Sequence, residues 1–140
     1  MSSVHIISVW CCSSLVHLNV RYGMRNVGMD FDRSIFGMKL SDCRSMARCL
    51  EYSESLTFLN LSHNMLDDDK VRMLASGLIN NLSVVHLDLS HNRISDRGIR
   101  AIAKLLHNRS IIAALHLQDN QVRVQSITLE WTSAIRELFF

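Results

Sequence analysis

The chain has 140 residues, a formal net charge of +2 at pH 7 and 48% hydrophobic residues. This length allows one small domain with one core, and the near-neutral charge predicts neither nucleic acid nor a membrane surface as a partner. No run is apolar for long enough to span a bilayer, and residues 4–16 lack the basic start of a secretion signal.

A repeated phrase organises residues 15–123, and residues 1–14 precede it as an irregular segment. The phrase has apolar residues at its positions 1, 4 and 6 and Asn at position 9, and its complete copies end at Asn64, Asn92 and Asn120, 28 residues apart. Because side chains alternate along a strand, the apolar residues at positions 4 and 6 share one face, which predicts a short strand with a buried side.

The first unit of the array is altered and enlarged. Leu15-x-x-Leu18-x-Val20 fits the strand phrase, but Gly23 stands where the Asn is expected. Leu18 is 41 residues from Leu59, so this unit has 13 residues more than the period. We place the excess in residues 24–39, as a loop that protrudes and carries binding or as an irregular packing segment.

Three helices are expected after the first three strands, over residues 42–52, 67–79 and 96–106. The second helix opens with Asp67, Asp68 and Asp69, and acidic residues are favoured in a first turn. Asp96 is the expected N-cap of the third helix. The strands that alternate with these helices are expected near Leu18, Leu59, Leu87 and Leu115.

This plan predicts a definite fold class. A period of 28 residues with the Leu and Asn phrase is typical of leucine-rich repeats. We predict an α/β leucine-rich-repeat solenoid of the ribonuclease-inhibitor type, with a short parallel sheet on the concave face and helices on the convex face. Asn64, Asn92 and Asn120 should form a structural ladder that bonds turn backbone. Residues 124–140 depart from the pattern and form a divergent tail.

The concave face of a repeat array is a long surface for holding partners. Six polar or aromatic side chains are expected to point outward from the strands. The candidate protein-binding residues are Phe58, Asn60, His86, Asp88, His116 and Gln118. They are proposed from repeat geometry alone.

Catalysis is disfavoured, although Asp88 should lie beside His116 and could orient an imidazole. An active site needs converging groups, and the sequence has neither a nucleophile motif nor a phosphate loop near this pair. We therefore expect no enzyme activity, cofactor, metal or small-molecule substrate. The basic stripe Arg97, Arg100 and Lys104 is interpreted as a solvated helix face. Asp69 occupies the repeat position of Arg97, so an ion pair between them would contribute only about 0–1 kcal/mol.

The four cysteines, Cys11, Cys12, Cys43 and Cys49, are irregularly spaced, and two of them fall on an expected helix. Such usage favours a reduced intracellular chain over a disulfide scaffold.

Several segments outside the Leu and Asn phrases resemble a known family. The matches are Tyr22-Gly23-Met24-Arg25, Gly28-Met29-Asp30-Phe31, Asp42-Cys43, Asp67-Asp68-Asp69-Lys70, Asp96-Arg97-Gly98, Ala103-Lys104-Leu105-Leu106 and Asn120-Gln121-Val122-Arg123. Together with Leu87-Asp88-Leu89-Ser90-His91-Asn92, they make residues 15–123 similar to the T-complex-associated testis-expressed family of dynein regulatory complex subunits. The matches in the irregular stretch after the first strand, followed in register by Asp67-Asp68-Asp69-Lys70, are the most specific part of this resemblance.

This resemblance implies a structural role in the nexin–dynein regulatory complex, in the axoneme of motile cilia and flagella. Its partners would be other subunits of that complex and axonemal proteins, and its action would be regulation of dynein-driven motility. Two alternatives stay open: a free-standing cytosolic repeat protein that binds or inhibits an enzyme, and a regulator of a small GTPase.

Overall fold

The structure is a computed structural model that describes residues 14–22, 37–107 and 111–123. Its strands are β1 (His17–Asn19), β2 (Phe58–Asn60), β3 (His86–Asp88) and β4 (Ala114–His116). Its helices are α2 (Leu40–Tyr52), α3 (Asp68–Leu78) and α4 (Asp96–His107). Strands and helices alternate along the chain, and each of the first three strands is followed by one helix.

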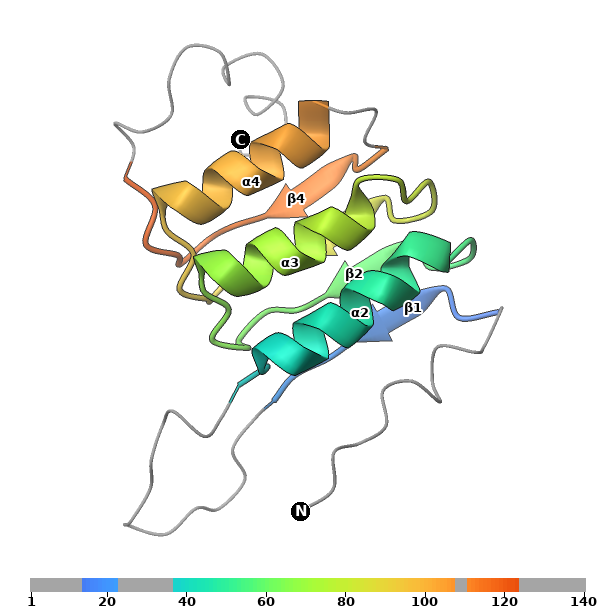
Figure 1. Ribbon diagram of the computed structural model, residues 1–140, viewed down its shortest axis with the longest axis horizontal. Coiled ribbons are helices and arrows are strands. Elements are labelled where there is room, and N and C mark those ends of the chain that lie inside the picture. Colours follow the sequence, from blue (N-terminus) through green and yellow to red (C-terminus); the bar gives the residue numbers. More distant parts are fainter. Residues whose placement is uncertain (1–13, 23–36, 108–110, 124–140) are drawn as a thin grey trace, which may run out of the picture.

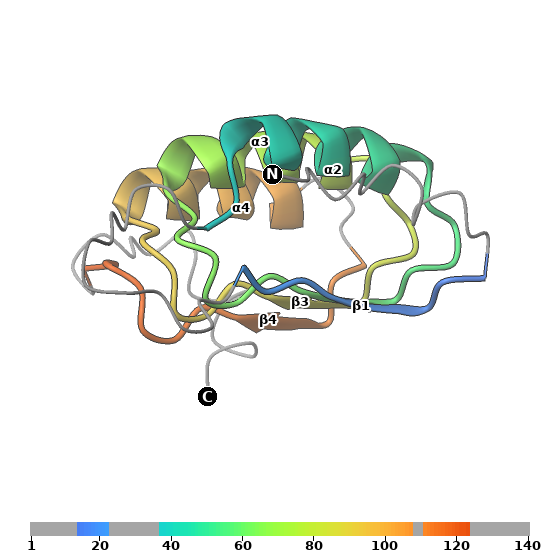
Figure 2. The same cartoon turned by 90° about the horizontal axis from the view of Figure 1, so that it is seen from below.

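The four strands form one parallel sheet in the order β1-β2-β3-β4. Its register places Leu18, Leu59, Leu87 and Leu115 side by side, which confirms the predicted strand centres. The helices stack in the same order and all cover one face of the sheet, as Figures 1 and 2 show. The leucine-rich-repeat solenoid of α/β class is therefore confirmed.

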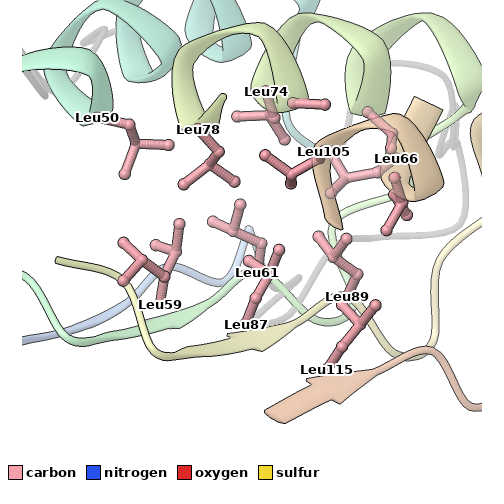
Figure 3. Packing of buried hydrophobic residues seen from close by; sticks show 14 of the residues in the cluster. Leu50, Leu59, Leu61, Leu66, Leu74, Leu78, Leu87, Leu89, Leu105 and Leu115 are labelled. Atoms are coloured by element: carbon pink, nitrogen blue, oxygen red, sulfur yellow. The ribbon is translucent and has the colours of Figure 1, made fainter. Parts of the chain in front are cut away.

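Leucines from both layers fill the space between the sheet and the helices (Figure 3). Leu59 and Leu87 point up from the strands, and Leu50, Leu74 and Leu105 point down from the helices; all five are buried. Burying one such side chain stabilises the fold by about 1.5–3 kcal/mol. Because no single repeat encloses these residues, the repeats are stable only as a stack.

The helix ends differ from the prediction by one or two residues. Helix α2 begins at Leu40, since the carboxylate of Asp42 accepts a hydrogen bond from the backbone N–H of Lys39 at 3.0 Å and closes the first turn. Asp67 caps α3 from outside by accepting from the N–H of Lys70 at 3.0 Å. The expected N-cap role of Asp96 is wrong, because Asp96 is already the first residue of α4.

Three segments named in the sequence predictions lie outside the described residues, wholly or almost wholly. They are the irregular segment 1–14, the enlarged stretch 24–39 and the tail 124–140. Where the chain re-enters the described part, Met38 is fully buried and its N–H donates to the carbonyl of Asn64 at 2.9 Å.

Candidate protein-binding surface

The face of the sheet that points away from the helices carries a row of three rings, here called the aromatic row: His17, Phe58 and His86. The parallel register places these residues opposite one another on β1, β2 and β3. Ring centroids are 5.5 Å apart between His17 and Phe58, and 6.1 Å apart between Phe58 and His86. Phe58 is half-buried between two exposed imidazoles, so it is less open than its repeat position suggested.

A second row runs beside it, here called the polar row: Asn19, Asn60, Asp88 and His116. These four residues are also neighbours in the register, as the repeat predicted for the last three. The strands of a sheet lie about 4.8 Å apart, so the two rows form one continuous surface. The structure thus brings together five of the six residues proposed from the sequence, and Gln118 follows two residues after His116.

The polar row is partly engaged in local hydrogen bonds. The Asn60 side-chain oxygen accepts from the N–H of Ser62 at 2.9 Å. In the next repeat, the Asp88 carboxylate accepts from the N–H and the hydroxyl of Ser90, at 2.9 and 2.6 Å. Asp88 therefore stabilises the turn after its strand, where Ser90 is buried.

His116 ends the polar row beside Gln118. The Gln118 side-chain nitrogen lies 3.3 Å from the Nδ1 of His116, and both side chains are exposed. Asp88 is opposite His116 in the register, but its carboxylate is bonded to Ser90. The Asp88 carboxylate is therefore engaged in the turn at Ser90, while the His116 ring lies beside the Gln118 amide.

The predicted asparagine ladder runs along the edge where the strands end, here called the turn edge. Asn92 is its central rung and is buried. Its side-chain oxygen accepts from the N–H groups of Asn64 and Leu66, at 2.9 and 3.0 Å, in the preceding repeat. Its side-chain nitrogen donates to three carbonyls, those of Leu61 at 3.1 Å, Leu89 at 2.9 Å and Ser90 at 3.1 Å.

The other two rungs use the same bonds with adjacent repeats. Asn64 accepts from the N–H of Tyr22 at 2.8 Å and donates to the carbonyl of Val20 at 2.6 Å. Asn120 accepts from the N–H of Ile94 at 3.0 Å. These asparagines therefore join each repeat to the one before it.

Residues just before these asparagines adopt the left-handed backbone conformation. His63, His91 and Asp119 have φ values of 58°, 54° and 54°, which a non-glycine residue adopts at a cost. The rings of His63 and His91 stack at 4.2 Å, and the Nδ1 of His91 lies 3.0 Å from the carboxylate of Asp119. Desolvation lowers the pKa of His63 below its ordinary value, with the charges of Arg21 and His91 acting in the same direction.

Two structural residues were missed by the sequence analysis. Asn81 is buried at the opposite edge of the array, where its side-chain nitrogen donates to the carbonyls of Leu50 at 2.7 Å and Ser53 at 3.1 Å. Asp68 accepts from the N–H groups of Ser95 at 2.8 Å and Gly98 at 3.0 Å, which ties the start of α3 to the start of α4. Asp recurs one period later, at Asp96, and this recurrence was the sign in the sequence that Asp68 has a structural role.

Cys43 is a buried residue of α2, and its burial raises the pKa of the thiol to about 12. The thiol therefore stays protonated and is a poor nucleophile. Cys43 and Cys49 both carry free thiols on α2, whereas Cys11 and Cys12 lie outside the described residues. Within the described ranges, no helix is long and apolar enough to cross a membrane, and no group of three or more metal-binding side chains comes together.

Comparison with known proteins gives consistent matches over the repeats. The family model "Leucine Rich repeat" matches residues 52–75 and 80–103. A protein named dynein regulatory complex subunit 5 from Chlamydomonas reinhardtii is 64% identical over 56 residues, which is 40% of this chain and 14% of that protein. Proteins of the same name from Mus musculus and Homo sapiens are 38% and 37% identical over 67 and 69 residues, 48% and 49% of this chain. The match again covers 14% of their length.

A solved structure described as leiomodin-1 actin-binding site 2 has the same fold, with a TM-score of 0.62 and 19% identity. The match covers 88% of this chain and 65% of that one. At 19% identity, this match shows a shared fold and carries no information about function. The chain therefore has a leucine-rich-repeat fold, and 40–49% of it is similar to a stretch that makes up 14% of the proteins named dynein regulatory complex subunit 5.

Proposed function

We propose that this chain is a structural subunit of the dynein regulatory complex, in the axoneme of motile cilia and flagella. The observation that carries the proposal is the 64% identity over 56 residues to the Chlamydomonas subunit. In this role it binds other subunits and axonemal proteins, and it contributes to the regulation of dynein-driven motility as a scaffold and not as an enzyme.

The aromatic and polar rows are the proposed binding surface. His17, His86 and His116 are exposed on it, and Phe58 lies half-buried between two of these imidazoles. Aromatic anchors near the centre of a contact dominate many interface energies, at about 2 kcal/mol or more each. The patch crosses all four strands, so a partner that lies along it would contact every described repeat.

The carboxylate of Asp88 supports a binding role over a chemical one. Its oxygen already accepts two hydrogen bonds from Ser90, so it is fixed in place and can present its charge without rearrangement. Fixed polar groups of this kind favour specificity and orientation at an interface.

The test is retention of the tagged chain on demembranated axonemes. We expect it to co-sediment with axonemes and to resist a mild salt wash, because a subunit held by a packed interface is less sensitive to screening than one held by surface charge alone. Axonemes that lack the complex serve as the control and should not retain it. A chain that stays in the soluble fraction would contradict the proposal and favour a free-standing cytosolic binder.

A further inference from the structure

A groove of about 400 Å³ lies on the helical side of the molecule, between α3 and α4. We call it the α3–α4 groove. It is on the opposite side of the sheet from the aromatic and polar rows, since the helices cover only one face (Figure 2). Nothing in the proposed function uses it.

One repeat position explains why the groove exists. Gly77 of α3 faces Ala47 of α2, where an added Cβ would overlap the backbone of Ala47, so these two helices are in direct backbone contact. The residues 28 positions later are Leu105 and Ala75, and both line the groove. A leucine in the place of the glycine prevents the same close approach, and α3 and α4 pack less closely than α2 and α3.

The rim of the groove is basic. Arg72 contributes from α3, while Arg97, Arg100 and Lys104 contribute from α4, and all four are exposed. Arg97, Arg100 and Lys104 follow one another at three- and four-residue spacing, so they form a stripe along one side of the helix about 10 Å long. The sequence alone favoured a solvated face here, but it did not show that the stripe borders a groove.

Little negative charge offsets this rim. The Asp69 carboxylate lies 3.5 Å from the Arg72 guanidinium, in an exposed ion pair that contributes little to stability. Asp69 thus pairs with Arg72 of its own helix and not with Arg97, as the repeat positions had suggested. Asp68 is turned toward the start of α4, where it bonds Ser95 and Gly98. The charge balance of the groove therefore favours an anionic ligand.

The floor of the groove favours a polypeptide over a small anion. Ala75 and Leu105 are buried beneath it, and Ile79 at one end is 40% exposed. A phosphate or a sugar–phosphate chain offers no apolar groups for such a floor, and the net charge of +2 is too small for a general nucleic-acid surface. We propose that the α3–α4 groove binds an acidic amphipathic segment of a partner polypeptide, with its carboxylates on the rim and its apolar side chains on the floor.

A synthetic peptide can test this on the full chain. The probe is a fluorescent helical peptide of about 15 residues, with Glu at three- and four-residue spacing on one side and Leu on the other. Its control has Gln in place of every Glu. The Glu peptide should bind, and the Gln peptide should bind at least about tenfold more weakly, since charge pairing supplies the selectivity.

Two matched charge reversals locate the site. Arg100→Glu with Lys104→Glu should weaken binding of the Glu peptide at least about tenfold. Arg44→Glu with Arg48→Glu makes the same change at the same spacing on α2, outside the groove, and should leave binding within about twofold. All four positions are exposed, and circular dichroism checks that both variants fold. Ala101→Phe, which fills the groove without changing charge, should also weaken binding.

Three outcomes would overturn the inference. Equal binding of the Glu and Gln peptides would exclude charge recognition. Equal loss in the Arg44 and Arg48 variant would show a general charge effect. Binding of phosphatidylserine vesicles or polyuridine that depends on Arg100 and Lys104, without binding of the peptide, would assign the groove to another ligand class. Retention on axonemes is measured separately, so failure here leaves the proposed function standing.

Discussion

The turn edge and the polar row both carry amide or carboxylate side chains in successive repeats, yet their environments differ. Asn92 on the turn edge makes five hydrogen bonds to backbone groups and is buried. Asn60 in the polar row makes one, to Ser62, and is half-exposed. Periodicity alone thus does not separate a polar residue that holds the repeats together from one that a partner can reach. The number of backbone groups within reach separates them.

The largest expected effect comes from breaking the central rung of the ladder. Asn92→Ala would leave two N–H groups and three carbonyls without their side-chain partner. Since each buried orphan costs about 1–3 kcal/mol, the free energy of unfolding should fall by about 3 kcal/mol or more. Urea denaturation measures it. Asn60→Ala, the matched change in the polar row, should cost below about 1 kcal/mol, and equal losses would remove the distinction between the two regions.

A smaller effect sharpens the comparison within the polar row. Asp88→Ala removes the acceptor of the Ser90 N–H and hydroxyl, and it should cost about 1–2 kcal/mol. Asp88→Asn keeps an oxygen in the same place, as Asn60 has in the preceding repeat, and should cost below about 0.5 kcal/mol. If both variants lose the same stability, the negative charge and not the turn geometry is what the fold needs at this position.

The smallest expected effect is a pH dependence of the free energy of unfolding that arises at His63, next to Asn64 on the turn edge. The pKa of His63 in the folded chain lies below its ordinary value of 6.5, because of desolvation and the charges of Arg21 and His91, with Asp88 and Asp119 acting the other way. As the pH falls below about 6.5, the unfolded chain therefore takes up a proton at this position before the folded chain does, and stability declines.

His63→Gln should remove that part of the decline. The measurement is the free energy of unfolding of both chains at about pH 7.5 and about pH 5.5. The substituted chain should lose less stability between the two values. An identical or steeper loss would show that the stacked pair of His63 and His91 does not carry the pH response.

The regular part of the fold was predictable because its causes are local. Leu59 and Leu87 mark strand centres through the alternation of side chains, and the register of the sheet follows from the repeat period. The asparagine ladder was predictable because the repeat period places one Asn at each turn, where its amide reaches backbone groups of its own repeat and of the preceding one.

The remainder depended on choices between neighbours that periodicity does not encode. The carbonyl groups that accept from Asn81 lie near the end of α2, in the preceding repeat, and the sequence around Asn81 does not predict them. The spacing of the helices follows from Gly77 and Leu105 at one shared repeat position. In the candidate site, the repeat placed His86 beside Phe58, but His17 on the other side was not among the predicted residues, and the half-burial of Phe58 depends on how both histidine rings tilt against it.

The most direct test of the central claim asks whether the aromatic and polar rows hold the chain on the axoneme. Phe58→Ala with Asp88→Asn alters one residue of each row and keeps the turn at Ser90. Its matched control, Tyr52→Ala with Glu51→Gln, alters an exposed aromatic and an exposed acid on α2. We predict that retention falls at least about tenfold for the first pair and stays within about twofold for the control. Equal retention of both would contradict the account and would move the interface to another segment, with residues 24–39 the first to replace.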